Sequence, residues 1–173
     1  MNQSPSTENP DFNDPLAVMR ADHTRILEHC DILEKLVSHI AEKGVDEEAR
    51  SSTAQALNFF ATVAVKHQQD KEQNLFPLLN RQSLKLADIV YRLKREQSDL
   101  DNMWVEIQGA LKTPATLKDN QAFSTQAEKF CDGYRRHIAY EEKELLGIAQ
   151  HILSQRQLEE LGDAMAKRRG VRR

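Results

Sequence analysis

Hydrophobic side chains recur at intervals of three and four residues in four long stretches of the chain. These stretches span residues 16–40, 57–78, 86–111 and 123–152. Such spacing places the apolar side chains on one face of an α-helix, and that face packs toward a core. The pattern therefore predicts four long helices that share one core.

Each of the four apolar faces is interrupted near its middle by polar side chains. A buried polar group costs free energy unless another group satisfies it. We therefore expect the interruptions to meet at one depth and to form a shared polar site inside a four-helix bundle. The interrupting residues, in chain order, are His23, His67, Lys71, Gln97, His137 and Glu141.

Capping signals set the expected limits of the first two helices. Asp14 and Pro15 predict a helix start, and Gly44 predicts its end, so the first helix should span about 15–43. The second helix can begin at Asp46 or at the pair 51–52. Pro77 either kinks this helix or ends its regular part, because proline lacks the backbone N–H that an α-helix needs.

The remaining helices are delimited in the same way. The third should start near Ser83 and end around 109–113, before Pro114. Thr116 and Asp119 resemble a capping box for a fourth helix that runs to about 153. A short fifth helix is predicted from Ser154 to Gly170. Because the loops are short, we expect an all-α, up-down-up-down bundle over 14–153, with residues 1–13 as a disordered tail and 154–173 as a short helix and basic tail.

Composition agrees with an ordinary soluble domain and changes the picture little. The chain has 173 residues, 29% of them charged and 39% hydrophobic, and a formal net charge of −3. It has no apolar run that could span a bilayer and no secretory signal at its start, so we expect a cytoplasmic protein without a membrane partner. Cys30 and Cys131 fit two buried thiols rather than a disulfide. Oligomeric state is not readable from the sequence.

The net charge is uneven, because five of the last seven residues are Lys or Arg. A basic segment can bind nucleic acid or an acidic membrane surface. Here no aromatic residues are interleaved with the charges, so we expect a solvated tail and no nucleic-acid partner.

The polar interruptions have the chemistry of a metal site. His137 and Glu141 are four residues apart and therefore lie on one helix face. An imidazole paired with a carboxylate suits iron, zinc or manganese, and His67 and His23 offer two further imidazoles from other helices. The sequence therefore indicates His23, His67, His137 and Glu141 as candidate metal ligands. His29, His39 and His151 lie off the inner faces or far along the chain and are expected to have local roles.

The chain resembles the hemerythrin-like HHE cation-binding domains at four segments, which together cover about residues 15–153. The resemblance lies in 20–26 around His23, in 67–79 with its Leu-Phe-Pro ending, in 93–104, and in the His-x-x-x-Glu motif at 137–146. It implies a non-haem di-iron centre bridged by two carboxylates, with a role in oxygen binding, oxygen or redox sensing, iron handling or nitrosative stress. It also implies His23, His67, His137 and Glu141 as ligands.

Two residues depart from that pattern. Lys71 stands where the second bridging carboxylate is expected, and Gln97 stands where helix three should supply a histidine. Two cations about 3.5–4 Å apart need bridging anions, so we do not expect a normal di-iron centre. Glu72 is adjacent, but one residue turns the helix by about 100°, so its side chain should point away unless the helix bulges.

Three interpretations of the site stay open. In the first, one metal ion, iron or else zinc, binds His23, His67 and Glu141, with His137 as a fourth ligand. The protein would then be non-enzymatic and serve oxygen or redox sensing or iron handling. Its partners would be the metal ion and O2 or another small diatomic ligand. In the second, no metal binds, because Lys71 pairs with Glu141 and the fold serves as a scaffold or binds a protein partner. The third, catalytic oxygen or peroxide activation, has no further support in the sequence. The position of the Lys71 amine discriminates between the first two.

Overall fold

The computed structural model describes residues 10–173 as an all-α protein, with no strand among these residues. Its elements, in chain order, are α1 (Pro15–Lys43), α2 (Glu47–Ala61), α3 (Val63–Gln69), the π-helical turn η1 (Asp70–Leu75), α4 (Phe76–Asn80), α5 (Leu84–Leu111), the 3-10 turn η2 (Pro114–Thr116), α6 (Gln121–Glu141), the π-helical turn η3 (Glu142–Leu146), α7 (Gly147–Ile152) and α8 (Gln155–Arg168).

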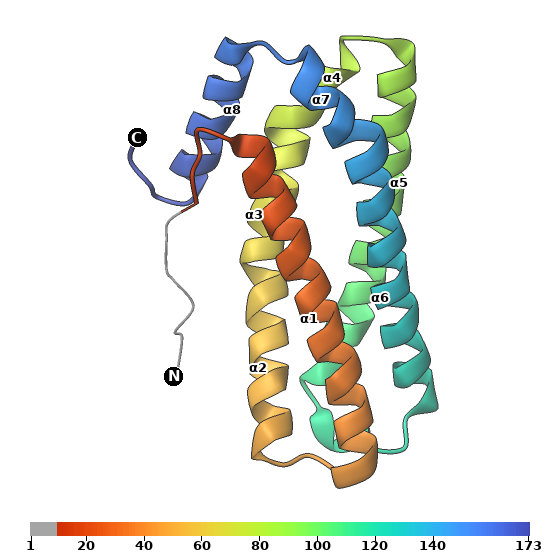
Figure 1. Cartoon of the computed structure of the whole chain (residues 1–173). Helices are drawn as coiled ribbons and strands as arrows, with labels where there is room; N and C mark the ends of the chain where they lie inside the picture. The colour runs from red at the N-terminus through yellow and green to blue at the C-terminus, as the bar shows by residue number, and fades with distance from the viewer. Residues whose placement is uncertain (1–9) are drawn as a thin grey trace.

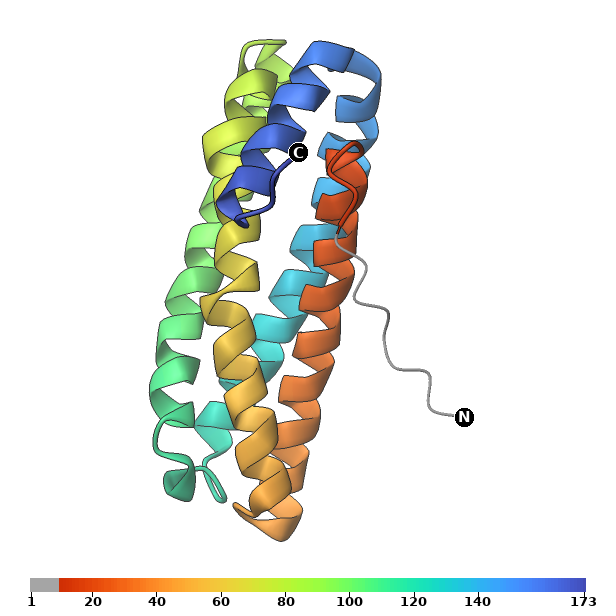
Figure 2. The same cartoon turned by 90° about the vertical axis from the view of Figure 1, so that its left-hand side faces the viewer.

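These elements form four long rods and one short helix. α1 and α5 are each one rod; α2, α3, η1 and α4 follow one another as the second rod, and α6, η3 and α7 as the fourth (Figure 1). The rods contact one another around a closed bundle, and α8 lies outside it against α1 and η1 (Figure 2). The predicted four-helix bundle with a fifth C-terminal helix is therefore confirmed.

Local capping explains most helix limits. Asp14 Oδ1 accepts a hydrogen bond from the Ala17 N–H at 3.1 Å, and α1 stops at Gly44, whose φ of 76° suits glycine. Asp46, not the serine pair, starts α2 by accepting from the Ala49 N–H at 2.9 Å. Ser154 starts α8, as predicted, and forms a capping box with Gln157.

The predicted start of the fourth helix is wrong by a few residues. Thr116 belongs to η2, and its hydroxyl donates to the Thr113 carbonyl at 2.8 Å rather than capping a following helix. Asn120 caps α6 instead, accepting from the Phe123 N–H at 3.0 Å. Pro114 fixes the short 3-10 turn and so delays the helix.

Two rods contain a π-helical turn at equivalent places. In η1 the Phe76 N–H reaches the Lys71 carbonyl, and in η3 the Gly147 N–H reaches the Glu142 carbonyl, five residues back in each case. η1 ends at Leu75, two residues before Pro77, which lacks the N–H that a regular helix needs. The rod continues to Asn80, so Pro77 neither ends it nor breaks it. π-helical turns are often found at functional sites.

The apolar core is divided into two clusters. One includes Leu16, Met19, Leu75, Phe76, Leu93 and Leu145, and the other includes Ile26, Cys30, Phe60, Leu100, Phe130 and Ile138. In every rod the interrupting polar residue lies between residues of the two clusters. The polar residues therefore occupy one layer across the bundle, as the pattern predicted.

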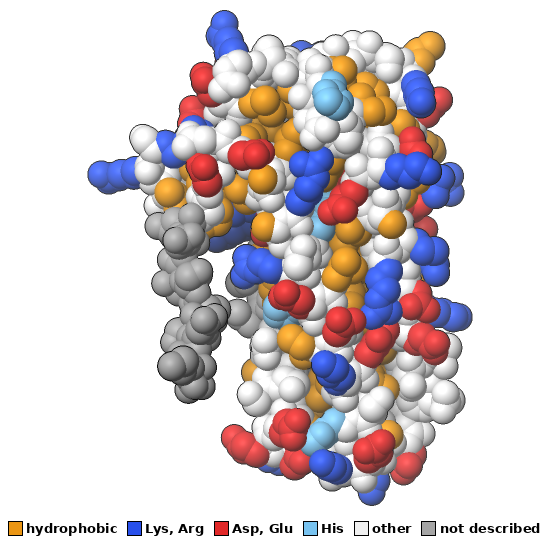
Figure 3. Space-filling view, viewed as in Figure 1, with side chains coloured by type: hydrophobic (Ala, Val, Ile, Leu, Met, Phe, Trp, Pro, Cys, Tyr) orange, Lys and Arg blue, Asp and Glu red, His pale blue; other side chains and the backbone are white. Residues whose placement is uncertain are grey.

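Acidic and basic side chains are interspersed over the face seen in Figure 3 rather than gathered in a field of one sign. Among residues 10–173, no helix is both long and apolar enough to cross a membrane. The call for a disordered tail at 1–13 lies mostly outside the described residues, but Phe12 is 3% exposed and belongs to the first core cluster, so order begins before Asp14.

Candidate metal centre

The polar layer brings together all four candidate ligands and Lys71. His23 comes from α1, His67 from α3, Lys71 from η1, and His137 and Glu141 from α6. Each of these five side chains is buried, with at most 2% of its surface exposed. Burial to this extent removes the screening by water, so their charges and hydrogen bonds act strongly on one another.

Glu141 is the anion at the middle of the cluster. Its Oε2 atom lies 2.9 Å from Lys71 Nζ, 3.5 Å from His23 Nε2 and 3.8 Å from His137 Nε2. Burial alone would raise the pKa of the Glu141 carboxyl, but the Lys71 ammonium and His23 outweigh it and hold that pKa well below its usual range. Glu141 is therefore ionised, and it forms a buried ion pair with Lys71.

Two of the histidines have lowered pKa values. Burial and the neighbouring Lys71 charge lower the pKa of His67 from 6.5 to about 4. The same two causes lower the pKa of His137. A neutral imidazole keeps one lone pair, which is the state required of a metal ligand.

Each of the three histidines has a carboxylate near its Nδ1 atom. His23 Nδ1 is hydrogen-bonded to Glu142 at 2.9 Å, and His137 Nδ1 to Glu96 at 3.0 Å. His67 Nδ1 lies 3.5 Å from Asp22 Oδ2 but is not hydrogen-bonded to it.

Their Nε2 atoms, His67 Nδ1 and Glu141 Oε1 are buried without a hydrogen-bond partner among the described residues. In His23 and His137 the carboxylate at Nδ1 holds the proton there and leaves Nε2 free to bind a cation.

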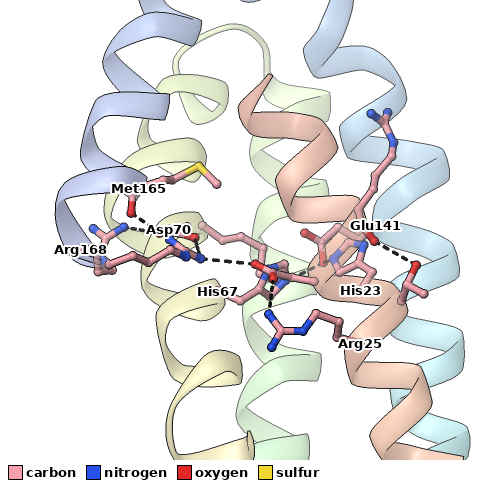
Figure 4. Close-up of polar contacts among 12 residues, drawn as sticks. His23, Arg25, His67, Asp70, Glu141, Met165 and Arg168 are labelled. Atoms are coloured by element: carbon pink, nitrogen blue, oxygen red, sulfur yellow. Dashed lines mark hydrogen bonds and ion pairs between the residues drawn. The ribbon is translucent and has the colours of Figure 1, made fainter. Parts of the chain in front are cut away.

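These donors fit one cation. One ligand atom each from His23, His67 and Glu141 lie within 4.8 Å of one another, and all three residues are buried (Figure 4). Two imidazoles and one carboxylate are a set found at single-iron sites. His137 stands outside this group of three, but its Nε2 faces the same carboxylate.

The donors do not fit two cations. The Lys71 ammonium occupies the place where a second bridging carboxylate is expected, and its positive charge opposes another metal ion. Gln97 turns elsewhere: its amide donates to Asp101 Oδ1 at 2.9 Å and to the Tyr134 hydroxyl at 3.1 Å. Glu72 stays exposed and accepts from Gln68 Nε2, so the π-helical turn does not bring it inward.

A cavity of about 300 Å³ opens beside Gln97 and Tyr134. It lies between α2, α3, α5 and α6, and its walls include Phe60, Trp104 and Phe130. This volume is near the lower limit for small-molecule sites. The cavity therefore places a small, mostly apolar space one helical turn from His137.

Sequence reasoning missed a set of ion pairs behind His67. Asp70 is fully buried and pairs with both Arg168 and Arg169 from the end of α8. Arg169 also reaches Asp22 at 3.3 Å. The expectation that the basic segment is wholly solvated is thus wrong for these two arginines, because two buried carboxylates require their charge. The only sequence signal was Asp70 itself, which follows His67 by three residues on the inner face.

The other histidines have the local roles expected of them. His29 stacks on Phe59 with ring centroids 3.7 Å apart, and His39 pairs with Asp46 at the start of α2. Cys30 and Cys131 are free, buried thiols; Cys131 Sγ donates to the Cys30 carbonyl at 3.4 Å.

Comparison with known proteins agrees with the fold and with the chemistry of the centre. The family model described as the hemerythrin HHE cation-binding domain matches residues 14–149. An uncharacterized protein of Haemophilus influenzae is 26% identical over 161 residues, which cover 93% of each chain. The matched segment includes every residue of the polar centre, from His23 to Glu141, and ends before α8. The chain therefore belongs to the hemerythrin HHE cation-binding domain family.

Proposed function

We propose that this protein binds a single iron ion through His23, His67 and Glu141, with His137 available as a fourth ligand. Zinc is the next candidate for the same donors. We further propose a non-enzymatic role in oxygen or redox sensing or in iron handling, with O2 or another small diatomic molecule as the ligand of the centre.

One observation carries the proposal: buried imidazole nitrogens of three histidines lack hydrogen-bond partners around Glu141. His23 and His137 each face a carboxylate with Nδ1 and direct an unpartnered Nε2 toward Glu141 Oε2, while both ring nitrogens of His67 are unpartnered among the described residues. A packing role alone would not call for so many unpartnered nitrogens in one layer, because each unpartnered atom costs about 1–3 kcal/mol. A cation beside Glu141 would satisfy one nitrogen of each histidine.

Lys71 is compatible with one cation. Its ammonium bonds Glu141 Oε2, while Glu141 Oε1 has no partner among the described residues. Glu141 can therefore offer Oε1 to a metal ion while Oε2 stays with Lys71. The ammonium then supplies the positive charge that a second metal would bring.

A bound iron ion would supply reversible electron transfer or binding of a small ligand at its open positions. The residues provide the rest. Glu141 supplies the negative charge, the three outer carboxylates fix the imidazole orientations, and the surrounding apolar clusters exclude water. The cavity beside Gln97 gives a small apolar molecule a place to approach this layer.

The test is metal analysis of protein purified without a metal-affinity tag. After anaerobic ferrous loading we expect about one iron per chain, lost in His67→Ala and retained in His151→Ala, whose imidazole is exposed and far along the chain. About two irons per chain would show that Lys71 and Gln97 had been misjudged. No bound iron or zinc would reject the proposal.

A second candidate is favoured by the 2.9 Å contact between Lys71 and Glu141. That pair already neutralises the buried carboxylate, so the fold could serve as a metal-free scaffold or partner-binding protein. This candidate requires that the centre stay metal-free after loading. It also requires that added Fe²⁺ or Zn²⁺ leave the thermal midpoint of unfolding unchanged, whereas a specifically bound ion raises it.

A further inference from the structure

α8 is attached to the bundle through charged groups that lead to the candidate centre. It packs against η1 and α1, the elements that carry Lys71 and His23. Figure 4 shows Arg168, Asp70 and His67 following one another from α8 toward Glu141. The family match ends at residue 149, before α8 begins.

Arg169 joins two buried carboxylates. Its guanidinium donates to Asp70 at 2.6 and 3.1 Å and to Asp22 Oδ2 at 3.3 Å. Its position is fixed from two further sides, by a hydrogen bond to the Met165 carbonyl at 3.0 Å and by the ring of Phe12, 5.7 Å away. A guanidinium presents a planar fork of donors, so it can orient two carboxylates at once.

The Asp22 oxygen that Arg169 holds also faces His67 Nδ1, at a distance too long and a geometry too poor for a hydrogen bond in this arrangement. Asp22 Oδ2 lies 3.3 Å from Arg169 Nη2 and 3.5 Å from His67 Nδ1. Asp22 is 5% exposed, and its other oxygen faces Arg25 at 3.7 Å, an arginine whose side chain is half exposed. Arg169, whose side chain is 15% exposed, is therefore the less exposed of the two cations beside Asp22 and the one that contacts the oxygen facing His67.

We infer that Arg169 is a positioning residue for the candidate centre, acting through Asp22 on His67. It holds Asp22 so that His67 keeps its proton on Nδ1 and presents the Nε2 lone pair to the other donors. Outer partners of this kind typically change metal affinity by about 10–100-fold when they are lost. The inference rests on the proposed cation site, and it makes the C-terminal helix part of that site.

Arg168 provides a matched control. It comes from the same turn of α8 and bonds the same Asp70, together with Gln73 and Asn74, but it makes no contact with Asp22. Arg168→Gln and Arg169→Gln should therefore disturb α8 to a similar degree. Only Arg169→Gln removes the contact with Asp22, the residue that faces His67.

The experiment uses the full-length chain and two readouts. The first is the tautomer of His67 in metal-free protein, from long-range ¹H–¹⁵N spectra, with the signal assigned by its loss in His67→Gln. We expect the Nδ1–H form in the parent and in Arg168→Gln, and a shift toward Nε2–H in Arg169→Gln and in Asp22→Asn. The second readout is Zn²⁺ affinity by chelator competition, expected to fall about 10-fold in Arg169→Gln and to change little in Arg168→Gln.

An unchanged His67 tautomer in Arg169→Gln would overturn the inference, and so would equal shifts in the two arginine variants, which would indicate a general loosening of α8. The metal-free readout separates the two proposals. If the parent protein binds neither zinc nor iron but the tautomer shifts as expected, the cation site is rejected and the positioning role stands. If the parent binds metal and Arg169→Gln neither shifts the tautomer nor weakens binding, the cation site stands and the positioning role of Arg169 is rejected.

Discussion

The Lys71 ammonium lies 2.9 Å from Glu141 Oε2 at the centre of the bundle, and neither side chain has more than 2% of its surface exposed. A buried ion pair of this kind is weak evidence for stability in itself, because desolvation offsets most of the attraction. Its consequence is that neither charge can be removed alone without leaving the other buried and unpaired.

Replacing Lys71 by Met should therefore be strongly destabilising in metal-free protein. The expected loss is about 3–5 kcal/mol in the free energy of unfolding, measured by urea titration in the presence of a chelator. The double variant with Glu141→Leu should recover most of this loss. Additive effects of the two substitutions would contradict the ion pair.

A second metal should bind if the two departures from the family pattern are reversed. Lys71→Glu with Gln97→His restores a carboxylate and an imidazole at the positions that the family resemblance assigns to ligands. We expect iron content to rise from about one to about two per chain after anaerobic loading. Lys71→Gln with Gln97→His is the control, since it removes the positive charge without supplying a bridging anion. Equal iron content in the two variants would count against the assignment.

The stability of the metal-free protein should fall as the pH decreases from about 6.5 to about 4. In the unfolded chain His67 takes up a proton near its usual pKa of 6.5, whereas burial and Lys71 lower that pKa to about 4 in the folded protein. The unfolded state therefore binds more protons between these values, so acidification favours it. The loss over this window should be about 3 kcal/mol from His67.

The pH dependence has an internal control. His67→Gln should reduce the slope of unfolding free energy against pH between 6.5 and 4 and leave the contribution of His137, whose pKa is also lowered by burial, while His151→Gln should leave the slope unchanged. Glu141 acts at lower pH: because its folded pKa is depressed, its contribution is present above the usual carboxyl pKa of 4.5 and is lost only as the pH falls below that value.

Two glycine substitutions should have opposite effects. A Cβ atom at Gly162 would lie 2.1 Å from the Phe12 carbonyl oxygen, so Gly162→Ala must displace the N-terminal segment or α8. We expect a loss of about 1–3 kcal/mol, typical of overpacking. At Gly109 in α5 nothing lies within 4 Å of the same atom, so Gly109→Ala should stabilise by about 0.5–1 kcal/mol through helix propensity. Chemical denaturation measures both, and a neutral Gly162→Ala would show that this contact is not required.

The sequence was enough to predict the bundle and the depth of its polar layer. Both follow from local rules. Three- and four-residue spacing defines an inner face, and the constant rise of an α-helix per residue sets how far along that face His23 or Gln97 lies. Capping chemistry predicted the start of α8 at Ser154. It misplaced the start of α6, because Pro114 and Thr116 form a separate turn before Asn120.

The network behind His67 could not be predicted in this way. Arg169 is separated from Asp22 by 147 residues and from Asp70 by 99, and no periodicity connects a helix end to a distant carboxylate. The orientation of each imidazole could not be predicted either. It depends on Glu142, Glu96 and Asp22, and only the structure shows where those carboxylates lie. Whether the four inward donors hold a metal stays a prediction.

The polar layer also specifies how the rods align lengthwise. Apolar faces alone permit one helix to slide past its neighbours, because leucine against leucine is nearly as favourable one turn away. A slide of one rod by one turn, about 5.4 Å, would move Lys71 or Glu141 into an apolar cluster and leave its partner buried and unpaired. The polar layer therefore fixes the lengthwise register of the rods. Every alignment other than the one that brings the charged and imidazole groups together leaves buried charges unpaired, with or without a bound cation.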